Sequence, residues 1–179
     1  MRERAAVGED VAKFAVNSVA VETGASSSKD LDMDGSRGEL LEVSGNLDID
    51  VFGFFQVSGG FALSKSTGTI TLSDTAATEL TVDQLTLGAS NVSAFAGIAG
   101  GTLDAVGLEL TDVEFALGIF SDQADPTRTW TALQATAGSF GFIGVEDLSV
   151  TGTTLSVSIN QAPVAEDVAN FAVNSVAVK

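Results

Sequence analysis

Apolar and polar residues alternate strictly over a long stretch of the chain. From Leu41 to Leu63 every odd position is apolar or glycine, and most even positions are polar. Successive side chains of an extended strand point to opposite faces, so this pattern predicts a half-buried sheet. Gly45, Gly53 and Gly59 are positions where the strand can bend. Similar alternation recurs over residues 106–119 and 148–159, with odd-length steps between the runs that reset the face.

The chain is therefore predicted to be all-β, with an elongated repetitive architecture. No window of helical length has a 3.6-residue period, and residues 73–84 are the only candidate for a short helical turn. The hairpin signal at residues 66–69 favours an antiparallel or mixed curved sheet. A β-solenoid, in which parallel coils stack, is the alternative that the pattern leaves open.

The two ends of the chain carry almost the same sequence. Residues 9–22 read EDVAKFAVNSVAVE and residues 166–179 read EDVANFAVNSVAVK, so twelve of fourteen positions are identical at an offset of 157 residues. Such a duplication is typical of a tandem array in which one strand appears twice. Residues 1–179 are accordingly predicted to be a single β-repeat module of about one 157-residue period.

A second, weaker period lies inside the first. Small polar elements flanked by apolar residues recur at a mean spacing of roughly 22 residues, which is in the range of solenoid coils or two-strand units. They are interpreted as turns, and they lie at residues 43–47, 57–61, 87–92, 110–113, 135–140, 150–155 and 173–176.

Composition removes whole classes of chemistry. The chain has no Cys, His or Tyr, so disulfides, thiol nucleophiles, imidazole bases and the common zinc sites are excluded. Its 8 basic and 24 acidic residues give a net charge of −16, which would repel nucleic acid and anionic membranes. No apolar stretch is long enough to insert into a bilayer. We expect no enzymatic activity, no nucleic-acid partner and no membrane insertion.

One acidic motif is typical of calcium binding. Asp30, Asp32 and Asp34 alternate and are followed by Gly35, a spacing that lets carboxylate oxygens converge on a hard cation while glycine permits a sharp turn. The bidentate Glu of a full twelve-residue loop is replaced by Leu41. The predicted Ca²⁺ ligands are therefore those of a shortened loop, namely Asp30, Asp32, Asp34, Ser36 and Glu39, with a solvated acidic linker as the other interpretation. Asp122 and Asp125 form a second, weaker acidic loop.

For the other candidate residues, a structural role explains the sequence at least as well as a functional role does. The pairs Asp48/Asp50 and Asp112/Glu114 resemble general acid–base pairs, but we expect them to lie on an exposed strand face with no Tyr, His or nearby Arg to tune or orient them. Phe52 and Phe54 fall on the otherwise polar face, either as a lateral contact surface or tucked back by a turn at Gly53. Trp130 could stack on a sugar ring, although a lone Trp that begins an apolar strand is more often a core residue.

Several segments resemble the β-strand repeats that are tandemly arrayed in giant secreted, adhesin-like bacterial proteins. They are LTLGASNVSAFAG (85–97), DAVGLELTDVEFALGIF (104–120), RTWTALQATAGSFGFIGVEDLSV (128–150) and TTLSVSIN (153–160). The resemblance implies an extracellular or cell-surface setting and a structural or adhesive role. We expect a module that joins neighbouring copies head to tail by strand sharing and is stiffened by calcium; the alternative is a glycan- or ice-binding adhesin module.

Overall fold

The computed structural model describes residues 12–14 and 18–172, and in this part of the chain every sheet is antiparallel. The only helical segment among these residues is a single 3-10 turn, Gly35–Arg37. The all-β prediction is confirmed. The chain divides into two compact units, Met1–Leu40 and Leu41–Lys179, which are described separately.

The first unit contains a short hairpin. Strands β1 (Val19–Gly24) and β2 (Ser27–Leu31) pair antiparallel, with a register shift before the turn. The chain then forms the 3-10 turn, and Asp34 caps it by accepting hydrogen bonds from the Ser36 amide at 2.9 Å and the Ser36 hydroxyl at 2.7 Å. A carboxylate at this position satisfies amides that a short helix leaves unpaired.

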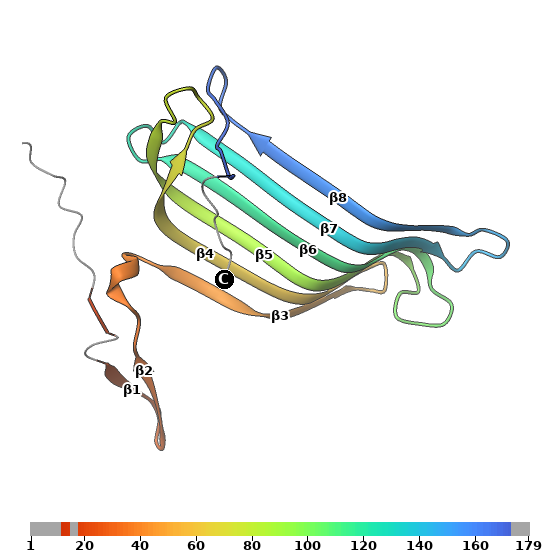
Figure 1. The fold of residues 1–179 in the computed structure, drawn as a ribbon. Helices are drawn as coiled ribbons and strands as arrows, with labels where there is room; N and C mark the ends of the chain where they lie inside the picture. The colour runs from red at the N-terminus through yellow and green to blue at the C-terminus, as the bar shows by residue number, and fades with distance from the viewer. Residues whose placement is uncertain (1–11, 15–17, 173–179) are drawn as a thin grey trace, which may run out of the picture. The chain divides into compact units, whose positions relative to one another are not determined.

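The second unit is one six-stranded sheet in which spatial order equals chain order (Figure 1). Its strands are β3 (Leu41–Val51), β4 (Phe55–Thr71), β5 (Glu79–Ile98), β6 (Val106–Asp122), β7 (Thr129–Ile143) and β8 (Val150–Gln161). Because each strand pairs antiparallel with the next, the β-solenoid alternative is wrong. The bend expected at Gly53 is present as a turn in which the Phe54 amide donates to the Val51 carbonyl at 2.9 Å.

The register sorts the side chains onto two chemically different faces. Residues directly opposite each other on neighbouring strands share a face. One face, which we call the apolar face, carries rows of large apolar side chains across the sheet, such as Val43, Leu63, Leu87, Leu117, Leu133 and Ile159. The opposite face, which we call the polar face, carries small or polar rows, such as Ser44, Ala62, Gly88, Ala116, Gln134 and Ser158.

The small polar elements interpreted as turns lie inside strands. Residues 43–47, for example, are in the middle of β3, and residues 57–61 are in β4. Several of these elements contain irregularities instead: the register shifts at 58–60 in β4 and at 89–94 in β5, and Asp112 in β6 has a positive φ of 51°. The turn interpretation is wrong because a bulge uses the same small and polar residues as a turn without reversing the chain. Residues 173–176 lie outside the described residues.

Two other local predictions are also wrong. Residues 66–69 continue β4 without a turn, and residues 73–84 contain no helix. The real reversal between β4 and β5 lies at 72–78, where Asp74 accepts hydrogen bonds from the amide and hydroxyl of Thr78 at 2.8 and 2.6 Å. These bonds lower the pKa of Asp74, the side-chain bond from Thr78 having the larger effect.

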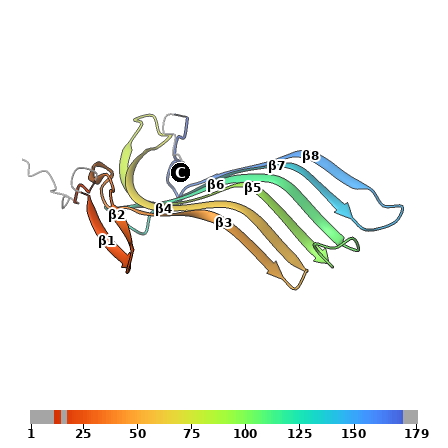
Figure 2. The same cartoon turned by 90° about the horizontal axis from the view of Figure 1, so that it is seen from below.

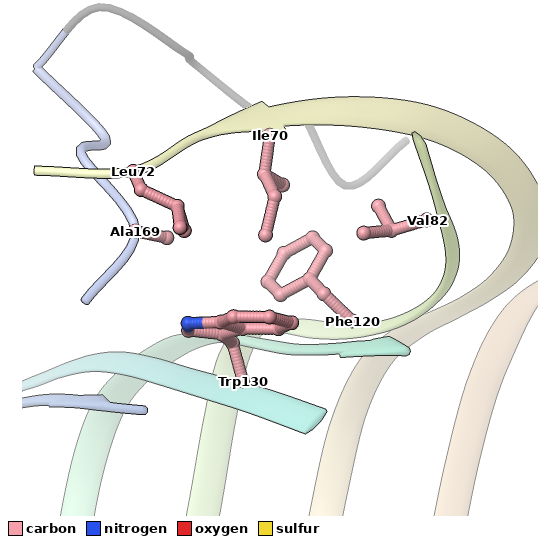
Figure 3. Packing of buried hydrophobic residues seen from close by; sticks show 6 residues of the cluster. All are labelled: Ile70, Leu72, Val82, Phe120, Trp130 and Ala169. Atoms are coloured by element: carbon pink, nitrogen blue, oxygen red, sulfur yellow. The ribbon is translucent and has the colours of Figure 1, made fainter. Parts of the chain in front are cut away.

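The enclosed core lies at one end of the polar face. There the β4–β5 hairpin curls over the sheet (Figure 2), and its side chains meet those of β6 and β7 from above (Figure 3). Both Phe120 and Trp130 are only 1% exposed in this cluster. Its members are Ile70, Leu72, Val82, Phe120, Trp130 and Ala169, with Phe171 packed against them. Trp130 is therefore a core residue and is not available to stack on a sugar.

Candidate assembly surfaces

The apolar face is largely uncovered. Many of its side chains on all six strands are more than a third exposed, and these are Leu41, Val43, Leu47, Ile49, Val51, Phe55, Leu85, Leu108, Ile119, Phe142, Val150, Leu155, Val157 and Ile159. Together they leave on the order of 1,000 Å² of apolar surface in contact with solvent. Contiguous apolar patches of this size mark interaction sites.

Both edges of the large sheet are open in the described residues. Strand β3 forms one edge and β8 the other, and all eleven residues of β3 are exposed. Strand β8 is exposed along almost its whole length. An edge strand presents unpaired amides and carbonyls that can pair with another strand, so each edge is a second kind of candidate assembly surface.

Two shallow grooves cross the polar face. The larger, of about 720 Å³, runs over glycine and alanine positions of the middle strands, including Gly60, Ala62, Gly88 and Ala116. The second, of about 510 Å³, is lined by polar groups that include Asp48, Asp50, Gln56 and Glu109. Small side chains cause the first groove because they leave the main chain of the sheet exposed.

The acidic pairs lie on exposed positions of the sheet, as expected. Asp50 accepts hydrogen bonds from the Gly53 amide and from Gln56 Nε2, both at 2.8 Å. The Gly53 bond, followed by the Gln56 bond, lowers the pKa of Asp50, which keeps this carboxylate ionised rather than poised to donate a proton. Asp112 and Glu114 are also exposed.

The predicted calcium ligands are spread over several local structures. Asp30 is in β2, opposite Ala20, and Asp32 follows the end of that strand. Asp34 caps the 3-10 turn through Ser36, and Glu39 is an exposed residue before β3. Over the described ranges, no group of three acidic side chains is arranged to hold a metal ion. Calcium binding by these residues stays a prediction.

The carboxylates of the second acidic loop bond to neighbouring residues of the same chain. Asp122, which is only 3% exposed, forms a 3.0 Å ion pair with Arg128. Asp125 accepts hydrogen bonds from the Thr127 hydroxyl and amide at 2.6 and 3.1 Å. These bonds, led by that of the Thr127 hydroxyl, lower the pKa of Asp125. The loop between β6 and β7 is thus stabilised by its own residues.

The phenylalanines at the β3–β4 turn point away from the core. Phe52 is 93% exposed with a φ of 52°, and Phe54 is more than half exposed. The interpretation that a turn at Gly53 tucks one of them back into a core is wrong. The tight turn itself explains this, because its residues lie beyond the last paired positions, Val51 and Phe55.

Sequence patterns alone did not reveal the surface that buries part of the duplicated segment. Residues 166–171 pack against the end of the polar face, where Ala169 is 2% exposed and forms an isolated antiparallel bridge with Leu72. Residues 12–14 of the first copy are exposed or half-buried, so the described parts of the two copies have different surroundings. The signal was the duplication, but which elements the segment contacts depends on the tertiary fold.

Comparison with known protein families, characterised proteins and solved structures finds no match to this chain. The resemblance to adhesin-like repeats therefore stays a prediction that depends on the sequence segments alone. Within residues 12–14 and 18–172, no helix is long and apolar enough to cross a membrane.

Proposed function

We propose that this chain is a structural repeat module of a long extracellular or cell-surface protein, and that neighbouring copies join through the edges and the apolar face of its sheet. The uncovered apolar face is the observation that carries this proposal. A stable protein interface buries about 800 Å² on each partner, and the exposed apolar surface here is of that order. An isolated module would leave this surface in water at a large cost in free energy.

The topology supports continuation of the sheet from one copy to the next. The chain enters the sheet at one edge, β3, and leaves it at the other, β8. Because there are six strands, a following copy of β3 placed beside β8 would continue the antiparallel alternation. In such an array each module contacts only its neighbours, and stability is a sum over modules and junctions.

The duplicated sequence supports the same conclusion independently. A segment that returns after 157 residues with twelve of fourteen positions unchanged is what one period of a tandem array contains. The strongly acidic composition keeps long arrays soluble, since like charges oppose nonspecific aggregation.

Sedimentation velocity over a range of concentrations tests the proposal. The chain should associate reversibly, and Val157→Lys, which places a charge on the apolar face of edge strand β8, should shift it toward monomer. Ser156→Lys is the matched control: it adds the same charge to the adjacent residue of β8, on the polar face. A chain that stays monomeric at every concentration, or equal effects of the two substitutions, would contradict association through the apolar face.

A second candidate function is glycan binding on the polar face. The observation that favours it is the 510 Å³ groove, where Asp48, Asp50, Gln56 and Glu109 offer acceptors and donors suited to sugar hydroxyls. Titration of the chain with neutral oligosaccharides, followed by NMR, would place shifts at these residues. Shifts unchanged by Gln56→Ala would argue against this groove.

A further inference from the structure

Residues 166–171 are held at the end of the polar face by main-chain hydrogen bonds. The Ser73 amide donates to the Val168 carbonyl and the Asn170 amide donates to the Thr71 carbonyl, each at 2.8 Å. These two bonds flank the bridge between Leu72 and Ala169. The segment thus adds a very short strand to the end of β4, a contact that any sequence could make through its backbone.

Side chains of the sheet recognise more of the segment. Trp130 Nε1 donates to the Asp167 carbonyl at 2.9 Å, and Asn160 Nδ2 donates to the Ala169 carbonyl at 2.8 Å. Arg128 pairs with the Glu166 carboxylate at 2.9 Å. We call the surface formed by Thr71, Leu72, Ser73, Phe120, Arg128, Trp130 and Asn160 the docking slot.

Two side chains of the segment fit the docking slot by shape. Ala169 is almost fully enclosed beside Leu72 and Trp130 (Figure 3), so a larger residue would not fit. The ring of Phe171 lies 5.7 Å from that of Phe120 at an angle of 42°. The sequence-specific contacts therefore use a Glu, an Ala and a Phe at fixed spacing, while Asp167 and Val168 are held through their carbonyls.

Residues 9–14 contain the same Glu, Ala and Phe at the same spacing as residues 166–171. They read EDVAKF, against EDVANF for residues 166–171, and differ only at Lys13, which corresponds to Asn170. At that position the slot receives the main-chain amide, and the Asn170 side chain accepts a hydrogen bond from the amide of Ala172, the residue that follows the segment. Glu9, Ala12 and Phe14 match the three side chains that the slot contacts.

We infer that the docking slot is a recognition site for the hexapeptide E-D-V-A-N/K-F, and that its second occupant is residues 9–14 of another copy of this chain. The inference rests on the proposed function, which supplies the neighbouring copy. In an array, the first six residues of each repeat would complete the core of the repeat before it. In a single chain residues 166–171 occupy the slot in preference to residues 9–14 of another copy, because their covalent connection to the sheet gives them a high effective concentration.

The full chain offers a test with its single tryptophan as the reporter. In Ala169→Glu the chain's own segment no longer fits, so Trp130 emission should shift to the red when the protein is too dilute for another copy to supply residues 9–14. Adding the peptide of residues 9–22 should reverse the shift, and the same peptide with Ala12→Glu should bind at least about tenfold more weakly because its charge would be buried. The double variant A12E/A169E should stay red-shifted at all chain concentrations.

A second variant keeps the proposal testable if Ala169→Glu does not fold. Asn170→Lys gives the tethered segment the sequence of residues 9–14 within the intact chain. It removes the hydrogen bond that the Asn170 side chain accepts from the Ala172 amide, but it keeps the main-chain bond to Thr71, so the segment should stay in the slot and the Trp130 emission should be unchanged. A red shift of the Trp130 emission in this variant would overturn the proposal. So would an unshifted Ala169→Glu emission, or a red shift that the peptide of residues 9–22 fails to reverse.

The outcomes separate this inference from the proposed function. Wild-type chains have a filled slot, so their association through edges and the apolar face is tested by sedimentation alone. Peptide rescue of Ala169→Glu is measured on dilute protein with free peptide in excess, so it reports on the slot alone. Rescue without wild-type association would support the slot and contradict the apolar-face interface.

Discussion

Two phenylalanines on opposite faces of the sheet should contribute very differently to stability. Phe120 is 1% exposed in the enclosed cluster, whereas Phe142 lies on the apolar face and is 36% exposed. Phe120 is also tightly packed: a Cβ on Gly118 would approach its ring to 2.5 Å. Replacing each by Ala compares an enclosed ring with one that contacts protein on one side only.

The expected losses of unfolding free energy differ by about 2–3 kcal/mol. Phe120→Ala removes the transfer free energy of a buried ring and leaves a cavity that the surrounding strands cannot close, a loss of about 3–5 kcal/mol. Phe142→Ala leaves no enclosed cavity, and it removes a side chain that is only partly buried, so about 1–2 kcal/mol of unfolding free energy should be lost. Phe142→Ala is thus the matched control for the loss of an aromatic ring.

Urea unfolding followed by far-ultraviolet circular dichroism gives both values. The measurement belongs at a concentration low enough to keep the chain monomeric, since association would stabilise the folded state by mass action. Equal losses, or a larger loss for Phe142→Ala, would refute the assignment of the core to the polar face. That result would mean that the apolar face is covered even in the dilute protein.

Three further predictions concern polar groups. Arg128→Met should cost about 1–3 kcal/mol in urea unfolding because it leaves the buried Asp122 carboxylate without its ion pair, and Asp122→Asn in the same chain should restore part of the loss. The pKa of Asp50 is lowered from its ordinary value of 3.8, so the ionised carboxylate stabilises the fold at pH values above 3.8, and this contribution is lost as the pH falls through the pKa of the folded state. Asp50→Asn should therefore flatten the acid limb of a plot of melting temperature against pH. An unchanged acid limb would count against a stabilising role of the Asp50 carboxylate. If calcium binds at Asp30, Asp32 and Asp34, EDTA should speed hydrogen exchange over residues 24–40, and identical exchange would refute the site.

The alternation of residue types predicted the strands well because it reports a local property, the two faces of an extended chain. The 41–63 run is strands β3 and β4, broken only at the turn near Gly53. What alternation could not show is which face is enclosed. The enclosed cluster lies on the polar face, since the β4–β5 hairpin curls over it and brings Ile70 and Val82 onto Phe120 and Trp130.

The turns were harder to locate because bulges and turns use the same residues. Gly59, in a segment interpreted as a turn, lies instead within β4. A methyl group there would come within 2.8 Å of Val92 Cα on β5, so glycine permits a close approach between strands rather than a reversal. The distinction depends on a neighbouring strand about thirty residues away, which local sequence does not specify.

The duplicated segment joins the sequence argument to the structural one. By sequence, residues 166–171 correspond to the start of the unit, since they repeat residues 9–14. By structure, they belong to the end of the sheet, where Ala169 is enclosed and Trp130, Asn160 and Arg128 bind the segment. In an array the period boundary and the folding boundary would therefore not coincide. Each junction would then be part of a core, and separating two repeats would require breaking that core.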